Sequence, residues 1–249
     1  MRLLTLNMNM FNLTVDDSFF SYLNLIFPDI AFIQECRYNR IVKNCEKYKI
    51  EWAGDYKEPI DSRIHLTAAF SPNKKIEKID VAPLSMYDYS CIFIKCNGYT
   101  FAGVHLPLFV ENKENEHECD EIKSKIINSK SKIICGDFNA WANNSNQEFL
   151  NSLLNSNSYI DLWQVGLEQE KAFYIDFAGK IRKADKKKHC KIRTFVGNTH
   201  IDYILANKAF LNLNEIIIDF RTLAFTDHCG IILNFDINQE RQENISLLE

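Results

Sequence analysis

The sequence predicts an α/β protein whose sheets mix parallel and antiparallel strands. Strand-length apolar runs alternate with helical patterns from one end of the chain to the other, without a linker rich in Pro, Gly or Ser. Asn97-Gly98 separates two of these runs and predicts a tight hairpin, which makes its strands antiparallel. Strands connected by helices as well as by hairpins indicate mixed sheets.

The expected elements follow in chain order. Three segments have a helical pattern, the first with Asp16 or Asp17 as its N-cap: Asp16–Phe27, Glu118–Asn128 and Ser145–Leu154. The expected strands are Arg2–Met8, Asp29–Gln34, His65–Phe70, Ile76–Val81, Cys91–Cys96, Tyr99–His105, Lys132–Cys135, Thr199–Leu205, Glu215–Phe220 and Gly230–Asp236. We expect residues 1–238 to form a single catalytic domain and residues 239–249 to form a polar tail.

The composition is that of a globular protein with a sizeable core. Of the 249 residues, 46% are hydrophobic and 12% are aromatic. The longest apolar runs have the length of strands, so we expect no transmembrane helix. Asn7, Asn9 and Asn12 interrupt any signal-peptide core. The eight cysteines include no Cys-x-x-Cys pair, which argues against zinc and favours reduced, buried thiols. We expect a cytoplasmic monomer.

Several predicted strands end in polar residues of one chemical kind. The run Ile133-Ile134-Cys135-Gly136 is followed by Asp137 and Asn139, which share one side of the chain because strand residues alternate. A carboxylate at this position suits a hard cation, and the neighbouring amide can donate to a phosphate oxygen. Similar strand-end or strand residues occur elsewhere in the chain: Asn7, Glu35, His105, Asp202, Asp227 and His228.

In this order, the segments resemble the motifs of the exonuclease–endonuclease–phosphatase superfamily, which includes pancreatic deoxyribonuclease, abasic-site endonucleases and inositol phosphatases. The resemblance extends from Asn7 to His228. It implies a four-layer α/β sandwich in which two mixed β-sheets are flanked by helices, with the active residues at one edge of the sheets. It also implies a phosphoric ester hydrolase that depends on Mg²⁺ or Mn²⁺ and uses in-line attack of water.

The resemblance implies a metal-binding role for four residues. Glu35 is the principal expected ligand, and its position after an apolar run makes its charge costly without a cation nearby. Asn7 would position the metal or a phosphate oxygen, and Asn9 competes for this role because it has the same strand parity. Asp137 and Asp227 are the further expected ligands.

The same resemblance implies the catalytic roles. Asp137 and Asn139 would handle the nucleophilic water and a phosphate oxygen, and His105 would contact the phosphate or act as general acid. His228 would act on the phosphoryl group or the nucleophile. Asp202 would orient His228, as carboxylates beside functional histidines generally do.

The sequence departs from the superfamily pattern at three places. His200 stands where many relatives have arginine, which puts a phosphate or structural contact there in doubt. Gly230 stands where proline is common. Asn7 lies in Leu-Asn-Met-Asn, without the tryptophan or tyrosine that is usual there. None of these changes removes a catalytic group, so we expect an active enzyme rather than an inactive binding module.

The substrate class is less clearly indicated. Lys180–Arg193 contains eight basic residues against one acid and precedes the strand with Asp202, so it is either a solvated loop or a contact for a phosphate backbone. The second interpretation makes Lys186, Lys187 and Lys188 substrate-binding residues, with Phe173, Tyr174 and Phe177 available to stack on bases.

The net charge of −4 argues against nucleic acid, because most proteins that bind it are basic. The acidic run Glu111–Glu121 is expected to be a solvated loop. We favour a nuclease acting on DNA or RNA. The alternative is a phosphatase or phosphodiesterase acting on a small molecule or a lipid headgroup.

Overall fold

The computed structural model describes residues 1–9, 16–36, 45–47, 50–54, 66–81, 90–107, 113–141, 144–156 and 158–238. In chain order the elements are β1 (Arg2–Asn7), α1 (Asp16–Ile26), β2 (Ile30–Cys36), β3 (Glu51–Gly54), β4 (Leu66–Ser71), β5 (Glu77–Lys78), β6 (Cys91–Cys96), β7 (Tyr99–His105), α3 (Lys113–Ser129), β8 (Ile133–Asp137), α4 (Ser145–Asn155), β9 (Tyr159–Asp161), α5 (Leu162–Glu168), β10 (Ala172–Ile175), β11 (Ile181–Lys183), α6 (Lys186–His189), β12 (Asp202–Asn207), β13 (Leu211–Asp219), the 3-10 helix η2 (Phe220–Ala224) and β14 (Gly230–Ile237).

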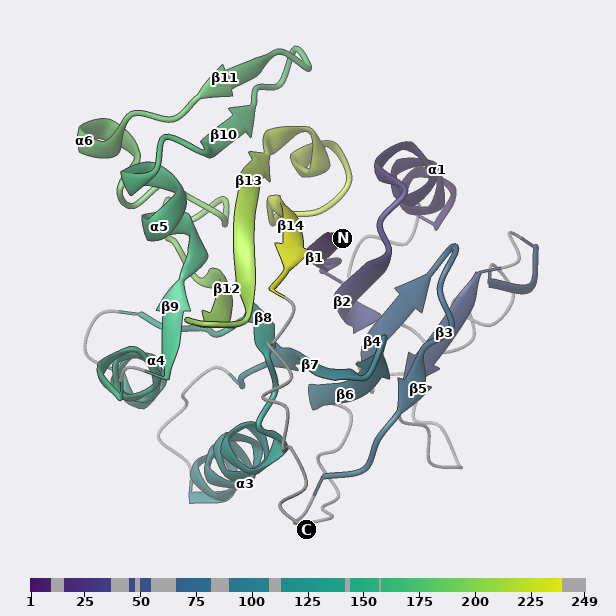
Figure 1. Cartoon of the computed structure of the whole chain (residues 1–249), viewed down its shortest axis with the longest axis vertical. Coiled ribbons are helices and arrows are strands. Elements are labelled where there is room, and N and C mark those ends of the chain that lie inside the picture. The colour runs from purple at the N-terminus through teal and green to yellow at the C-terminus, as the bar shows by residue number, and fades with distance from the viewer. Residues whose placement is uncertain are drawn as a thin grey trace, which may run out of the picture.

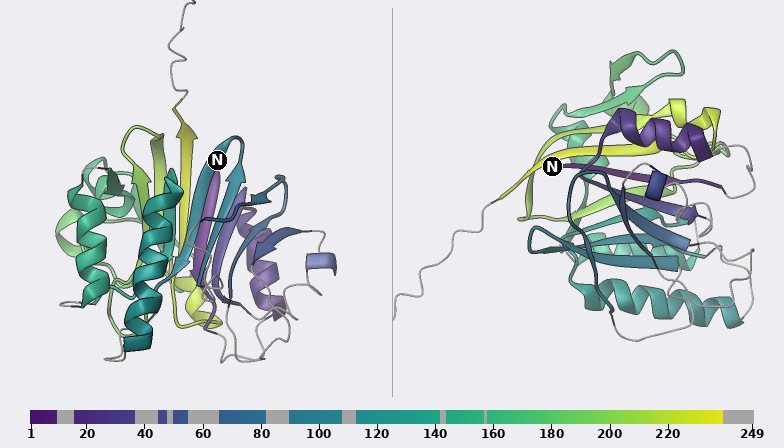
Figure 2. Two further views of the ribbon diagram at one scale, coloured as in Figure 1. Left: turned by 90° about the horizontal axis from the view of Figure 1, so that it is seen from below. Right: turned by 90° about the vertical axis from the view of Figure 1, so that its right-hand side faces the viewer.

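The strands form two sheets. One has eight strands in the order β11-β10-β13-β14-β1-β2-β4-β3, and the other has six in the order β5-β6-β7-β8-β12-β9 (Figure 1). Both sheets are mixed: β1 is parallel to β2 and antiparallel to β14, and β8 is parallel to β7 and antiparallel to β12. Helix α1 covers the outer face of the larger sheet, and α3 and α4 cover that of the smaller one (Figure 2). This is the predicted four-layer sandwich.

Strand alternation decides which side chains of β1 face the space between the sheets. Leu4 and Leu6 pack in the cluster formed with α1, whereas Leu3 belongs to the core that the two sheets share. Asn7 has the parity of Leu3. It therefore ends β1 on the inter-sheet side, where a polar group needs partners because it is fully buried.

The smaller sheet shows the same pattern. Ile133 and Cys135 of β8 belong to the shared core, and Ile134 packs on the outer face with α3 and α4. Asp137 consequently ends β8 on the inter-sheet side. Asp202 begins β12 directly opposite Asp137 in the antiparallel register.

Glycines are required at two places in the fold, in the β6–β7 hairpin and where the two sheets come into contact. Asn97 and Gly98 connect β6 to β7 with φ angles of 52° and 83°, as the predicted hairpin requires. Gly103 of β7 faces Phe32 of β2 across the two sheets, and a Cβ added there would lie 2.3 Å from the ring. The sheets therefore pack in direct contact beneath the site.

Both charged runs include regular structure, which corrects their interpretation as solvated loops. Residues 113–121 of the acidic run are helical, as part of α3. The basic run contains the edge strand β11 and the short helix α6. The sequence patterns also missed β3, β9, β10 and α5.

No helix among the described residues is long and apolar enough to span a bilayer. All eight cysteines are free thiols, and seven of them are buried. The predicted polar tail, residues 239–249, lies outside the described residues.

Candidate active site

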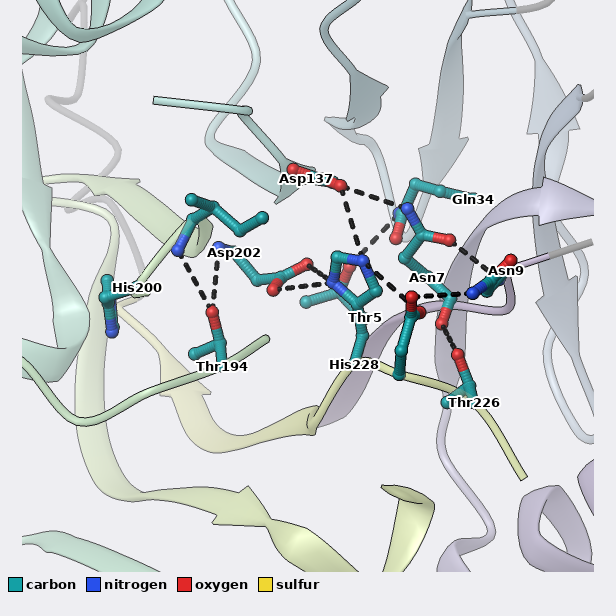
Figure 3. Close-up of polar contacts among 12 residues, drawn as sticks. Thr5, Asn7, Asn9, Gln34, Asp137, Thr194, His200, Asp202, Thr226 and His228 are labelled. Carbon is teal, nitrogen blue, oxygen red and sulfur yellow. Dashed lines mark hydrogen bonds and ion pairs between the residues drawn. The ribbon is translucent and has the colours of Figure 1, made fainter. Parts of the chain in front are cut away.

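The polar residues that the sequence places at strand ends meet at one edge of the two sheets (Figure 3). Asn7, Asp137, Asp202 and His228 are each at most 5% exposed. Burial of several ionisable groups is costly unless they are paired or hold a cation. Their mutual contacts therefore decide what this site can do.

Asn7 connects the two sheets. Its Nδ2 donates to Glu35 Oε1 at 3.1 Å and to Asp137 Oδ2 at 3.0 Å, so both amide hydrogens point at carboxylates. Its Oδ1 accepts from the backbone nitrogen of Asn9 at 2.9 Å. The amide holds two like charges near each other and orients them toward a common centre.

Glu35 reaches this centre through an irregularity in β2. The pairing of β2 with β4 shifts register between Ile33 and Cys36, and Glu35 has a φ of 54°. Strict alternation would place Gln34 on the inter-sheet side and Glu35 on the opposite side. The bulge instead turns Glu35 toward Asn7, a strained conformation of a kind that occurs often at functional sites.

Asp202 and His228 form a buried pair. Nδ1 of His228 lies 3.0 Å and 3.2 Å from the two carboxylate oxygens of Asp202, so this nitrogen carries a proton and donates. Nε2 points into the centre, 3.8 Å from Asp137 Oδ2 and 3.7 Å from Asp227 Oδ1. The start of β12 is fixed by Thr194, whose Oγ1 accepts from the backbone nitrogens of Ile201 and Asp202 at 3.1 Å each.

The burial and charges of the cluster shift two pKa values in directions that suit acid–base work. Burial alone would lower the pKa of His228, but the charge and hydrogen bond of Asp202, with Asp137 and Asp227 nearby, raise it to about 9. Burial and the charge of Asp202 raise the pKa of Asp137 to about 7, against the lowering effects of His228 and of the hydrogen bonds from Asn139 and Asn7. The imidazole is therefore charged near neutrality, and the carboxyl is poised to take up a proton.

Asp227 is held on the other side of His228. Its Oδ2 accepts from Asn9 Nδ2 at 2.6 Å, and its Oδ1 is buried without a hydrogen-bond partner in the described part of the chain. The preceding residue, Thr226, donates from Oγ1 to the backbone oxygen of Asn7 at 2.7 Å. This bond ties the turn before β14 to the end of β1.

The turn after β8 fixes Asp137. Its Oδ1 accepts from the backbone nitrogen of Asn139 at 2.8 Å. Asn139 has a φ of 46°, and its Nδ2 donates to the backbone oxygen of Leu106 at 2.7 Å. Only one of the two Nδ2 hydrogens can make that bond, so the amide keeps donor capacity for a substrate oxygen.

His105 completes the cluster from the end of β7. Its Nε2 lies 3.6 Å from Glu35 Oε1 and 4.0 Å from Asp137 Oδ2, and its side chain is 22% exposed. It is therefore placed between the carboxylates and the solvent.

The donor set fits a hard divalent cation. Ligand atoms of Asp137, Asp202 and His228 all lie within 4.8 Å of one another, and the buried Asp227 Oδ1 adds an oxygen with no hydrogen bond in the described part of the chain. Of these, Asp202 is committed to Nδ1 of His228, which is the contact of an orienting carboxylate. The oxygens of Glu35, Asp137 and Asp227 then remain as the natural ligands for Mg²⁺ or Mn²⁺.

Comparisons with known proteins give the fold but no close relative. No protein-family model matches the sequence, and no curated protein matches it. An AP endonuclease from Archaeoglobus fulgidus superimposes with a TM-score of 0.65 at 12% identity, covering 95% of this chain and 99% of that chain. The Neisseria 3′ phosphatase NExo (D146N), bound to a product DNA hairpin, gives 0.63 at 15% identity over 95% and 99%. The human Nocturnin catalytic domain with bound sulfate gives 0.63 at 14% identity over 96% and 94%.

The chain has the exonuclease–endonuclease–phosphatase fold. The fold that the sequence motifs implied is thus the fold of solved structures that superimpose on almost the whole chain.

The structure does not bring the lysines of α6 into the site. Ala184, just before α6, bonds to Ala172, which pairs with Ile216 three residues before the end of β13. The start of α6 is therefore level with a position three residues behind the end of β13, and its last residue, His189, packs against Tyr174. Lys186 pairs with Glu168 at 3.4 Å, with both side chains 64% exposed.

Sequence reasoning missed three supporting residues of this site. Thr194 and Thr226 act through single hydroxyl groups that bond to backbone atoms, for which the sequence carries no periodic signal. Phe195 packs against the His228 ring with centroids 4.9 Å apart. Strand parity made Asn9 a competitor of Asn7, and the structure uses both residues.

Proposed function

We propose that this protein is a divalent-metal-dependent phosphodiesterase that cleaves nucleic acid by in-line attack of water. The observation that supports this most strongly is the buried Asp202–His228 pair. Nε2 of His228 lies 3.8 Å from Asp137, the carboxylate that Asn7 links to Glu35. Known proteins of the same fold include a 3′-5′ exonuclease and an AP endonuclease. We also propose that residues 1–238 act as one catalytic domain and that the protein is a cytoplasmic monomer.

The residues that would hold the cation are Glu35, Asp137 and Asp227, and Asn7 would position the first two through its Nδ2. Bound there, Mg²⁺ or Mn²⁺ would neutralise charge on the phosphoryl oxygens. Hydrolysis of phosphate esters needs upwards of roughly 20 kcal/mol of barrier lowering, and acid–base help supplies only about 3–5 kcal/mol of it. The carboxylates at this centre thus serve the larger electrostatic part of catalysis.

Other steps of the reaction, namely proton transfer and the binding of phosphate oxygens, are assigned to side chains of the site. Asp137, held by Asn7 and by the backbone nitrogen of Asn139, orients the attacking water and accepts its proton. Protonated His228 donates from Nε2 to the phosphoryl group, while Asp202 keeps the ring oriented. Asn139 offers its second amide hydrogen to a phosphate oxygen. His105, at the mouth of the cluster, donates to the phosphate or to the leaving oxygen.

The substitution Glu35→Gln tests the metal site without relying on activity. The new amide side chain would keep an oxygen to accept from Asn7 but would lack the charge, so we expect Mn²⁺ affinity, followed by electron paramagnetic resonance, to fall at least about 10-fold. Glu51→Gln makes the same chemical change at an exposed position, at the end of the larger sheet away from the site. Equal Mn²⁺ affinity of wild type and Glu35→Gln, or full turnover in excess EDTA, would contradict the proposed metal site.

A substrate panel separates a nuclease from a small-molecule enzyme. Wild type with Mg²⁺ or Mn²⁺ is assayed on plasmid DNA, single-stranded DNA, RNA and a set of phosphate monoesters. Cleavage of a polynucleotide supports the proposal. Turnover confined to monoesters would support the alternative, a small-molecule or lipid-headgroup phosphatase.

We further propose that Lys186, Lys187 and Lys188 contact the backbone of long substrates. Replacing all three by Gln should raise KM on polynucleotides and flatten the salt dependence by about 0.7–0.9 in log–log slope per lost contact. A dinucleotide too short to reach α6 should be cleaved as by wild type. An unchanged salt slope on long substrates would leave α6 as a solvated surface.

A further inference from the structure

The hairpin formed by β10 and β11 extends the larger sheet (Figure 1). The register of the strands shows at which end of the sheet its turn lies. Ile175, the last residue of β10, pairs with Asp219, and Asp219 pairs with Gly230. Gly230 is two residues after His228. The turn that connects β10 to β11, residues 176–180, therefore lies at the same end of the sheet as the site and beside η2.

This hairpin turn is fixed by its own hydrogen bonds. Oδ1 of Asp176 accepts from the backbone nitrogens of Ala178 at 3.1 Å and Lys180 at 2.9 Å, and Oδ2 accepts from Arg182 Nε at 2.8 Å. Gly179 supplies the φ of 80° that the turn needs. The result is a preformed turn that holds the Phe177 side chain 66% exposed.

An aromatic and cationic surface leads from this turn to the site. The Phe177 ring lies 5.8 Å from that of Phe220, with an interplanar angle of 34°. The guanidinium of Arg193 lies 5.7 Å from the Phe220 centroid. Two residues after Arg193, the Phe195 ring packs 4.9 Å from His228. We name Phe177, Phe220 and Arg193 the hairpin surface.

The charge of the hairpin surface suits an anion. The acids that precede its two phenylalanines in the sequence are already paired: Asp176 with Arg182 at 2.8 Å, and the fully buried Asp219 with Arg221 at 2.6 Å. Within the described residues, no carboxylate pairs with Arg193 or Lys180. An exposed aromatic face beside cations without acid partners is the combination that binds single-stranded nucleic acid, because bases stack on the ring and the backbone meets the cations.

We propose that the hairpin surface binds a single-stranded segment of the substrate as it leaves the catalytic centre, with one base stacked on Phe177. This inference rests on the proposed nuclease function and names its substrate class. A single strand is required because the bases of an intact duplex have no free face for the ring.

The test measures binding and turnover separately. Binding of a labelled single-stranded oligonucleotide of about 12 nucleotides, as DNA and as RNA, is followed by anisotropy in EDTA. Phe177→Ala should weaken the binding of at least one of them by roughly 5- to 150-fold. It should leave hydrolysis of the p-nitrophenyl ester of thymidine 5′-monophosphate unchanged. Phe177→Trp should keep the affinity of wild type. Leu25→Ala, at an α1 residue that is 67% exposed, is the matched control and should have no effect.

Two outcomes would overturn the inference: Phe177→Ala binds both oligonucleotides as tightly as wild type, or it weakens duplex binding as much as single-strand binding. The proposed function fails separately, if the wild type with Mg²⁺ or Mn²⁺ hydrolyses no phosphodiester. In that case the anisotropy measurement still decides whether the hairpin surface binds a single strand.

Discussion

At the scale of single residues, the site depends on how neutral side chains keep like charges together. Asn7 donates both amide hydrogens to the carboxylates of Glu35 and Asp137, and Asn9 connects Asn7 to Asp227. Amide and carboxylate residues therefore alternate around the centre. The hydrogen bonds that hold these asparagines in the structure are therefore the same ones that position the carboxylates for a metal ion.

Asp202 and His228 should behave as one unit. Asp202→Asn removes the charge that orients and stabilises the imidazolium, and His228→Ala removes the imidazole itself. We expect each to lower kcat by about 10²–10⁴-fold and the double variant to be little worse than either single one. The measurement is steady-state turnover on one phosphodiester with saturating metal. Losses that multiply in the double variant would show that the two residues act independently.

Gly136 and Gly98 offer a test of why a glycine precedes Asp137. Both have positive φ, 137° and 83°, but a Cβ at Gly136 would lie 1.9 Å from the backbone oxygen of Val104, whereas nothing lies within 4 Å of one at Gly98. We expect Gly98→Ala to lower the free energy of unfolding by about 1 kcal/mol, and Gly136→Ala to lower it by at least about 3 kcal/mol. Urea unfolding of both variants gives the comparison. Equal losses would mean that only the φ angle matters.

Much of the candidate site could be predicted from polar residue types at strand ends, since Asn7 ends β1 and Asp137 ends β8 as expected. Asp202 was expected inside a strand and instead begins β12. Glu35 was predicted as a ligand from the resemblance and from its charge after an apolar run, whereas alternation alone points it the wrong way and a bulge corrects it. The hydroxyls of Thr194 and Thr226 could not be predicted, because they bond to backbone atoms distant in sequence.

At the scale of elements, prediction succeeded where a strand carries a long apolar run and failed at short strands. β10 and β11 contain four and three residues, and β11 is exposed throughout. Neither has the alternation that marks a half-buried strand. The charges of the basic run concealed β11 and α6, since lysine-rich sequence usually indicates a solvated loop.

The hydrogen bond between Tyr22 of α1 and Asp219 of β13 should make the free energy of unfolding depend on pH. Tyr22 donates to Asp219 Oδ2 at 3.0 Å, and burial and the Asp219 charge raise the pKa of Tyr22 well above its usual range. Because the folded pKa exceeds the unfolded value of about 10, the contribution to stability is complete below about pH 10 and is lost as the pH rises further. Tyr22→Phe should therefore cost about 1–2 kcal/mol near neutrality but show a shallower loss of stability at alkaline pH.

Urea unfolding of wild type and Tyr22→Phe between about pH 7 and pH 11 measures this difference. Parallel decline of the two proteins above about pH 10 would show that ionisation of Tyr22 is not coupled to unfolding.

At the scale of the whole molecule, one arrangement produces both the stability and the site. The core shared by the two sheets ends where their strands end, so the last inter-sheet position of several strands is both buried and close to solvent. Apolar residues fill this space along the strands, and polar ones occupy it at the edge. Such an edge can hold a cation and a phosphate in a region of low dielectric, where electrostatic stabilisation is large.

The reactivity of the cysteine thiols can show whether the two sheets unfold together. Seven of the eight cysteines are buried and only Cys190 is exposed. Cys135 and Cys229 belong to the shared core, where burial raises their thiol pKa values and suppresses the reactive thiolate. We expect one thiol of the native protein to react quickly with Ellman's reagent and the other seven to react only as the protein unfolds in urea. Cys190→Ser should abolish the fast phase and leave the slow one unchanged. A second fast thiol in native protein, or a slow phase split into separate urea transitions, would show that the two sheets open independently.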